Sequence, residues 1–153
     1  NYILVHSEPN DPLYVWGWVP GIYVQAQRMS PTPKPFEGQM HALPPWELAQ
    51  RVREIVGAFE KHPPKFIVDT RKRHFPFTVP PLELWPSTKD SFLPANDEAV
   101  KQYDLMYGKA LKEQISPAEA ERYEAMRPLR SYVMKNYQIV GQYGPQIVLF
   151  KRK

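Results

Sequence analysis

The chain has 153 residues, of which 20 are Lys or Arg and 16 are Asp or Glu, so its formal net charge is +4 at pH 7. This length suits one domain, and 42% hydrophobic with 24% charged residues is typical of a globular protein rather than a disordered one. The absence of cysteine excludes disulfide scaffolds, thiolate metal sites and cysteine nucleophiles, and only 7 glycines beside 18 prolines exclude a collagen repeat. No apolar run reaches the length of a membrane span, and so mild a charge does not favour nucleic acid as a partner.

The first part of the chain predicts a strand followed by a short helix. The chain begins with a short apolar stretch that ends in turn-forming residues. The β-branched and aromatic residues at 13–17 then predict a short buried strand that ends at Gly17. Pro20 suits the start of a helix with apolar residues at helical spacing, namely Ile22, Tyr23, Ala26 and Met29. Five prolines in residues 30–45 then exclude helix and central strand, and predict an extended surface loop.

Residues 46–59 carry the clearest helical pattern of the sequence. One apolar stripe recurs at intervals of three and four residues and consists of Trp46, Ala49, Val52, Ile55, Val56 and Phe59. Pro45 suits the first turn of this helix, and the prolines at 63 and 64 end it. Residues 66–69 follow as a second buried strand. Because strand, crossover helix and strand form the usual parallel unit, we expect strands 13–17 and 66–69 to pair in parallel.

The second half of the chain predicts helices and a hairpin after an irregular, proline-rich segment at 70–96. We expect one helix from about residue 97 to 113, and another that begins after Ser116 as N-cap and ends near Pro128. Residues 129–136 form one more turn or two, and two apolar strands around residues 143–146 form a β-hairpin. The sum is an α/β domain over residues 1–153, in which two parallel strands and a C-terminal antiparallel hairpin form a small mixed sheet packed with helices.

Motifs for catalysis or cofactor binding are not found in the sequence. It contains no glycine-rich phosphate loop, no dinucleotide fingerprint and no nucleophile elbow. None of the four histidines has a partner at metal-ligand spacing. We therefore predict no catalytic residue, no cofactor and no metal site in this chain.

The strongest binding candidates follow the ends of the two expected parallel strands. Asp69 ends the second strand, where α/β sheets place their ligand crevice. It either orients a ligand or serves as an acid or base, or else it caps the next turn or pairs with Arg71 or Arg73. Trp18 and Tyr23 follow the first strand, and either stack on a sugar beside that carboxylate or pack in the core. Trp16 itself is expected in the core, with Gly17 at positive φ.

Two basic stretches suit contact with anions. These are the run that contains Arg71 and Arg73, at residues 71–74, and the C-terminal run at residues 151–153. Each either contacts phosphate or anionic lipid headgroups, or is a solvated face.

Three stretches carry a family resemblance. They are Asp11-Pro-Leu-Tyr-Val-Trp-Gly-Trp-Val-Pro-Gly-Ile-Tyr23, the helix end and strand His62-Pro-Pro-Lys-Phe-Ile-Val-Asp69, and the closing pair of strands from Tyr137 to the basic tail. In this order they resemble the soluble C-terminal region of bacterial membrane glycosyltransferases of the dolichyl-phosphate-mannose–protein mannosyltransferase type. Residues 70–136 match no pattern of that family.

The resemblance implies a non-catalytic accessory domain on the extracytoplasmic, periplasmic face of the bacterial inner membrane. In that family the catalytic acids lie in loops between N-terminal membrane helices, so none of them transfers to this chain. The implied partners are the protein's own N-terminal transmembrane region, a polyprenyl-phosphate sugar, a glycan or protein acceptor and anionic lipid headgroups. Because the chain opens with Asn1, we expect a processed product or a piece of a longer protein. The alternative is a free-standing soluble α/β module that binds a nucleotide or sugar phosphate.

Overall fold

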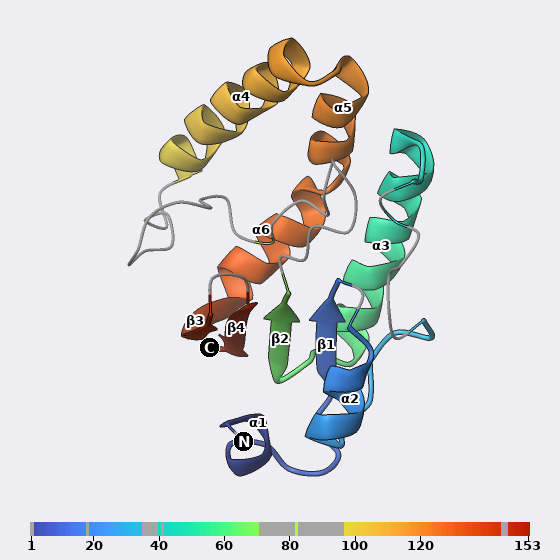
Figure 1. Ribbon diagram of the computed structural model, residues 1–153, viewed down its shortest axis with the longest axis vertical. Helices are drawn as coiled ribbons and strands as arrows, with labels where there is room; N and C mark the ends of the chain where they lie inside the picture. The colour runs from blue at the N-terminus through green and yellow to red at the C-terminus, as the bar shows by residue number, and fades with distance from the viewer. Residues whose placement is uncertain are drawn as a thin grey trace.

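The computed structural model describes residues 2–17, 19–34, 40, 42–70, 82, 97–144 and 147–153. A helix, a strand, two helices and a second strand come first along the chain, followed by three helices and the final hairpin (Figure 1). The helices are α1 (Tyr2–Val5), α2 (Gly21–Ala26), α3 (Pro45–Lys61), α4 (Asp97–Gln114), α5 (Pro117–Ala125) and α6 (Arg127–Asn136). The strands are β1 (Leu13–Trp16), β2 (Phe66–Asp69), β3 (Tyr137–Tyr143) and β4 (Ile147–Arg152).

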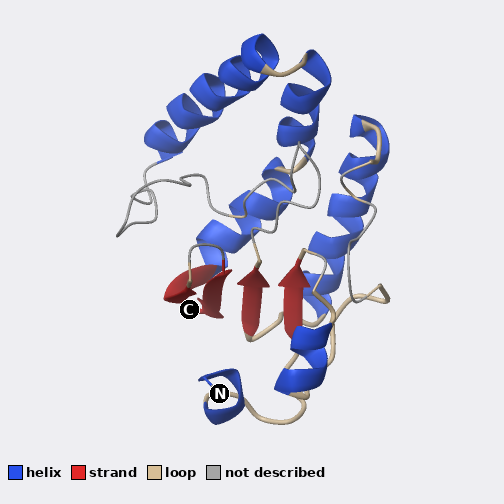
Figure 2. Ribbon diagram, viewed as in Figure 1, coloured by secondary structure: helices blue, strands red, loops and turns tan. Residues whose placement is uncertain are grey.

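The four strands form one mixed sheet in the order β1-β2-β4-β3 (Figure 2). β1 and β2 are parallel, as the crossover pattern predicts, and β4 is antiparallel to both β2 and β3. A bulge between Ile139 and Gly141 interrupts the pairing of the hairpin. The predicted α/β fold with a C-terminal antiparallel hairpin is confirmed.

Helix α3 begins and ends where the prolines predict, but its buried face differs in part from the expected stripe. Leu48, Val52, Ile55 and Phe59 are buried, whereas the indole of Trp46 is 69% exposed. The expectation for Trp46 is wrong because it precedes Leu48 by two residues, which places the two side chains about 200° apart around the helix. The buried positions repeat at intervals of four, three and four, so the amphipathic pattern itself is confirmed.

Helices α4, α5 and α6 follow the predicted order. The N-cap of α5 is as expected, since the Ser116 hydroxyl accepts a hydrogen bond of 3.3 Å from the Glu119 backbone N–H. Pro128 lies in the first turn of α6, where its missing N–H costs no helical bond, and α6 extends to Asn136. The sequence therefore underestimates α6, for which it predicts one more turn or two.

The two faces of the sheet are covered differently. Side chains of α3 and α6 pack on one face together with Tyr14, Trp16 and Ile67, and form the larger core. In the part of the chain that the structure describes, the short helices α1 and α2 lie beside the opposite face, whose apolar residues form a second, smaller cluster. The apolar stretch at Tyr2–Val5 is thus a helical turn, and Tyr2 and Ile3 pack against the cluster on this sheet face, which is called the open face below (Figure 1).

Candidate functional site

The ends of β1 and β2 lie together, as the sequence predicts. Trp16 and Asp69 are register partners at the carboxyl ends of the two parallel strands. Gly17 follows with φ +121°, and a Cβ there would meet the Thr70 hydroxyl at 2.0 Å. Only glycine fits this turn, because it combines positive φ with close backbone approach. Of the five candidate ligand residues, Tyr23 and Asp69 are described, whereas Trp18, Arg71 and Arg73 lie outside the described residues.

Asp69 lies in the core rather than on an accessible rim. Its side chain is 1% exposed, and its Oδ2 accepts a hydrogen bond of 3.1 Å from the backbone N–H of Leu82. Leu82 is itself fully buried in the larger core. The carboxylate therefore fixes a residue far along the chain against the strand end, and a ligand role for it stays a prediction.

Tyr23 connects α2 to the outer strand of the sheet. Its hydroxyl accepts a hydrogen bond of 2.9 Å from the backbone N–H of Val15, and its ring packs against the open-face cluster. Among the described strands, β1 is paired with β2 on its other side and with none on this one. The Tyr23 hydroxyl thus serves as hydrogen-bond acceptor for the Val15 N–H at the edge of the sheet. A role of the Tyr23 ring in stacking on a sugar stays a prediction.

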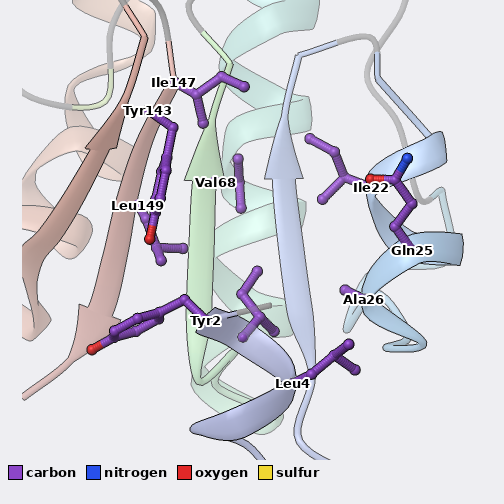
Figure 3. Close-up of a pocket in the computed structure, with 10 residues that line it drawn as sticks. Tyr2, Leu4, Ile22, Gln25, Ala26, Val68, Tyr143, Ile147 and Leu149 are labelled. Carbon is purple, nitrogen blue, oxygen red and sulfur yellow. The ribbon is translucent and has the colours of Figure 1, made fainter.

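A pocket with a volume of about 230 Å³ lies on the open face of the sheet. Figure 3 shows Val68 at its centre, Tyr143, Ile147 and Leu149 of the hairpin on one side, α2 on the other and α1 below. The residues that line it are Tyr2, Ile3, Leu4, Ile22, Gln25, Ala26, Val68, Tyr143, Ile147 and Leu149. None of them carries a charge, so the pocket suits a hydrocarbon group rather than a phosphate or a charged sugar.

Sequence reasoning missed this pocket. The strand sequences are almost continuously apolar, because every residue of β1 and β2 and the three central residues of β4 are buried. The available signal was alternation, which places Ile147 and Leu149 on one face and Val148 and Phe150 on the other. The sequence gives no sign that α1 and α2 leave the first of these faces partly uncovered.

A second polar group lies within the helical region, between α4, α5 and α6. The Arg130 guanidinium stacks on the Tyr123 ring at 3.7 Å, donates to the Tyr123 carbonyl at 2.7 Å and contacts Asp104 Oδ1 at 3.3 Å. Asp104 also accepts from the Tyr123 hydroxyl at 2.7 Å and pairs with Arg127 at 3.2 Å. Burial lowers the pKa of Arg130, while Tyr123 and Asp104 favour its charged form. Arg130 is 1% exposed, so this group joins helices and offers no access to a ligand.

Arg122, a buried residue of α5, contacts the segment that precedes α3. Arg122 donates to the backbone carbonyls of Leu43 and, at 2.6 Å, of Met40. Its Nε lies 3.4 Å from Glu119. Burial raises the pKa of Glu119 and lowers that of Arg122, and their mutual attraction opposes both shifts. Arg122 thus links α5 to Met40 and Leu43 in the segment before α3, and its buried guanidinium is closed to ligands.

Among the described residues, no group of three or more acidic or histidine side chains is arranged to hold a metal ion. In the same part of the chain, no helix combines the length and apolar composition needed to cross a bilayer. Comparison with protein-family models, curated proteins and solved structures gave no match.

Proposed function

We propose that this chain is a non-catalytic accessory domain of a polyprenyl-phosphate-sugar-dependent membrane glycosyltransferase. In this proposal it lies on the extracytoplasmic face of the bacterial inner membrane, beside the membrane-embedded region of the same protein. It contributes by binding rather than by making or breaking bonds.

The observation that carries the proposal is the uncharged pocket on the open face of the sheet. Its described polar groups are the phenols of Tyr2 and Tyr143 and the amide of Gln25. A site with this lining holds an apolar group of a lipid or of a neighbouring helix, and it offers no acid, base or nucleophile for glycosyl transfer.

The three stretches that resemble the glycosyltransferase family add support. They contain β1, β2 and the β3–β4 hairpin, which together make up the sheet. The segments that carry the resemblance are therefore neighbours in the fold, and each supplies residues to the pocket lining, namely Ile22, Val68, and Tyr143 with Ile147 and Leu149. The buried state of Asp69 supports this proposal over the alternative of a nucleotide or sugar-phosphate module, which needs accessible polar groups at the strand ends.

The first test is the coding sequence on the 5′ side of the codon for Asn1. Several apolar segments of spanning length, with an acidic pair in an early extracytoplasmic loop, are the expected result. A start codon within a few residues of Asn1 would overturn the proposal and leave the free-standing module.

The second test is glycosyl transfer by the complete membrane protein. Leu149→Asn places an amide in the pocket floor and should lower transfer from a polyprenyl-phosphate sugar without abolishing it. Leu105→Ser, on the exposed face of α4, is the matched control and should leave transfer unchanged. Equal activity of both variants and the unmodified protein would argue against a role for the pocket.

A further inference from the structure

One end of the molecule is rich in cationic side chains. α3 ends there immediately before β2 begins, and β4 ends there because it is antiparallel to β2, with Lys151 opposite Phe66. α6 ends there too, just before β3, whose Tyr137 pairs with Arg152. The cationic residues in the turns and element ends just named are Lys61, Lys65, Lys135, Lys151, Arg152 and Lys153. The acidic residues in the same turns and element ends are Glu8, Asp11 and Glu60, so this end favours an anionic partner.

Two of these cations are already committed to internal contacts. Lys65 pairs with Asp11 at 2.8 Å, and Lys153 Nζ donates to the carbonyls of Met134 and Lys135 at the end of α6. Lys151 has a different position. It is half-buried and follows Ile147 and Leu149 at intervals of two along β4, so it shares their face of the sheet.

The same end exposes large apolar side chains. Val5 of α1 is 76% exposed and Met29, beyond α2, is 82% exposed. Arg28 holds their two segments together, because it donates to the carbonyl and the hydroxyl of Ser7 at 2.7 and 3.0 Å. Figure 1 shows α1 and both chain termini at this end, and α4 at the opposite end. Apolar side chains beside lysines are the composition of a surface that rests on a membrane interface.

The pocket continues this surface along the open face. Tyr2 lines the pocket and contacts the ring of Phe66 edge-on, with ring centres 6.0 Å apart, and Phe66 is the register partner of Lys151. Lys151, Leu149 and Ile147 thus follow one another on one face of β4, and Leu149 and Ile147 line the pocket. This row is cationic at one end and apolar at the other, which complements a lipid with an anionic headgroup and a hydrocarbon chain.

We propose that this end of the protein binds an anionic phospholipid bilayer, and that the open-face pocket takes one acyl chain of a lipid whose phosphate meets Lys151. The inference rests on the proposed function for its choice of a bilayer over a soluble partner. Charge complementarity selects anionic over neutral lipid, and the exposed Val5 and Met29 enter the interface beside the bound chain.

The test uses the 153-residue chain and sedimentation with vesicles. Vesicles of phosphatidylcholine containing 30% phosphatidylglycerol should bind the chain, whereas pure phosphatidylcholine should bind it at least tenfold more weakly. Raising the salt concentration should weaken binding. Lys151→Gln should lower the partition coefficient about fivefold, as expected for one basic residue at an anionic surface. Val5→Ser should lower it several-fold.

Matched control variants lie on α4. Lys112→Gln and Leu105→Ser change an exposed cation and an exposed apolar residue at the opposite end, and should leave binding unchanged. Circular dichroism melting of all four variants confirms that each one folds.

The acyl-chain site has its own readout. Dioctanoyl phosphatidylglycerol, added below its critical micelle concentration, should shift the NMR methyl signals of Ala26, Ile147 and Leu149 in a saturable way.

Four results would overturn the inference, three of which concern lipid. They are absent vesicle binding at low salt, equal binding to neutral and anionic vesicles, and shifts spread over both faces of the sheet. A concentration-dependent dimer that shifts the same methyl signals without lipid would also overturn it and assign the face to self-association. None of these results bears on the spanning segments sought in the coding sequence, so the two proposals fail separately.

Discussion

The Tyr23 hydroxyl and the Val15 backbone N–H are joined across the outer edge of the sheet by a hydrogen bond of 2.9 Å. β1 is an edge strand, and an edge N–H without a partner invites pairing with another chain. The neighbouring outward N–H of Leu13 is satisfied in the same way, by the Met29 carbonyl at 2.9 Å. The turn at Gly17 and helix α2 thus fold the chain back to close this edge.

Tyr23→Phe should therefore destabilise the protein without changing its fold. Val15 is fully buried, and a buried N–H that loses its acceptor costs about 1–3 kcal/mol. Urea unfolding followed by circular dichroism measures the loss. Tyr143→Phe, which alters a phenol that is 48% exposed, should change stability by less than about 0.5 kcal/mol. Equal stability of both variants would mean that the Tyr23 hydroxyl is dispensable at this edge and would leave its role open.

Asp69→Asn should loosen the attachment of Leu82 to the end of β2. A hydrogen bond to a charged acceptor contributes about 1.5–3 kcal/mol, and the neutral amide keeps only part of it. We expect a loss of about 1–2 kcal/mol in urea unfolding, together with faster hydrogen exchange of the Leu82 amide. Glu113→Gln on α4 neutralises an exposed carboxylate and should alter neither quantity. Unchanged Leu82 exchange in Asp69→Asn would show that the carboxylate acts elsewhere and would favour its ligand role.

Much of the fold was predictable because local signals decide it. The turn at Gly17 was predictable because it needs a residue with positive φ. The start of α5 was predictable because Ser116 supplies an acceptor for the N–H groups of a helix N-terminus. The pairing of Trp16 with Asp69 follows from the parallel unit, so that part of the candidate site was also accessible to sequence reasoning.

The remaining features depend on contacts between distant residues. Nothing near β4 specifies that it pairs with β2, and nothing near Asp69 indicates a bond to Leu82. Helix α1 has four residues, too few for a periodic signal. Arg130 gives no sequence sign of burial, because arginine is usually exposed and its stabilising partners lie on α4 and α5.

Tyr137→Phe should change the response of stability to alkaline pH. The Tyr137 hydroxyl donates to the Pro64 carbonyl at 2.6 Å, and burial, followed by the neighbouring Tyr132, raises its pKa above the ordinary value of 10.0. A raised pKa in the folded state contributes stability that is complete below pH 10 and is lost as pH rises toward the folded pKa. Phenylalanine cannot ionise, so the variant should lose less stability between pH 9 and 11.

The measurement is the urea midpoint at pH 7, 9, 10 and 11. At pH 7 the variant should be less stable by about 1–3 kcal/mol, because the buried Pro64 carbonyl loses its donor. Above pH 10 the two curves should converge. Tyr143→Phe serves as the reference and should follow the unmodified protein throughout. Parallel curves for Tyr137→Phe and the unmodified protein would contradict the role assigned to this phenol.

Arg130 and Asp104 should be energetically coupled, since their ion pair joins α6 to α4 in a buried setting. Arg130→Met should cost about 3–5 kcal/mol, because it leaves the nearly buried Asp104 without one of its two cations. Asp104→Asn should also destabilise the protein, because Arg130 is then a buried cation without a carboxylate. The double variant removes both charges and should lose about 1–3 kcal/mol less than the sum of the single losses.

Urea unfolding of all four proteins completes this double-mutant cycle. The exposed Lys109 and Glu113 on α4, 3.8 Å apart, form the control pair, and a Lys109→Met, Glu113→Gln cycle should give a coupling below about 0.5 kcal/mol. Strict additivity for Arg130 and Asp104 would mean that the stacking of Arg130 on Tyr123, rather than the ion pair, holds α6 in place. Strong coupling would instead show that the ion pair fixes α6 against α4. Because α6 leads directly into β3, the pair would then also fix the position of the hairpin, whose Tyr143 lines the pocket.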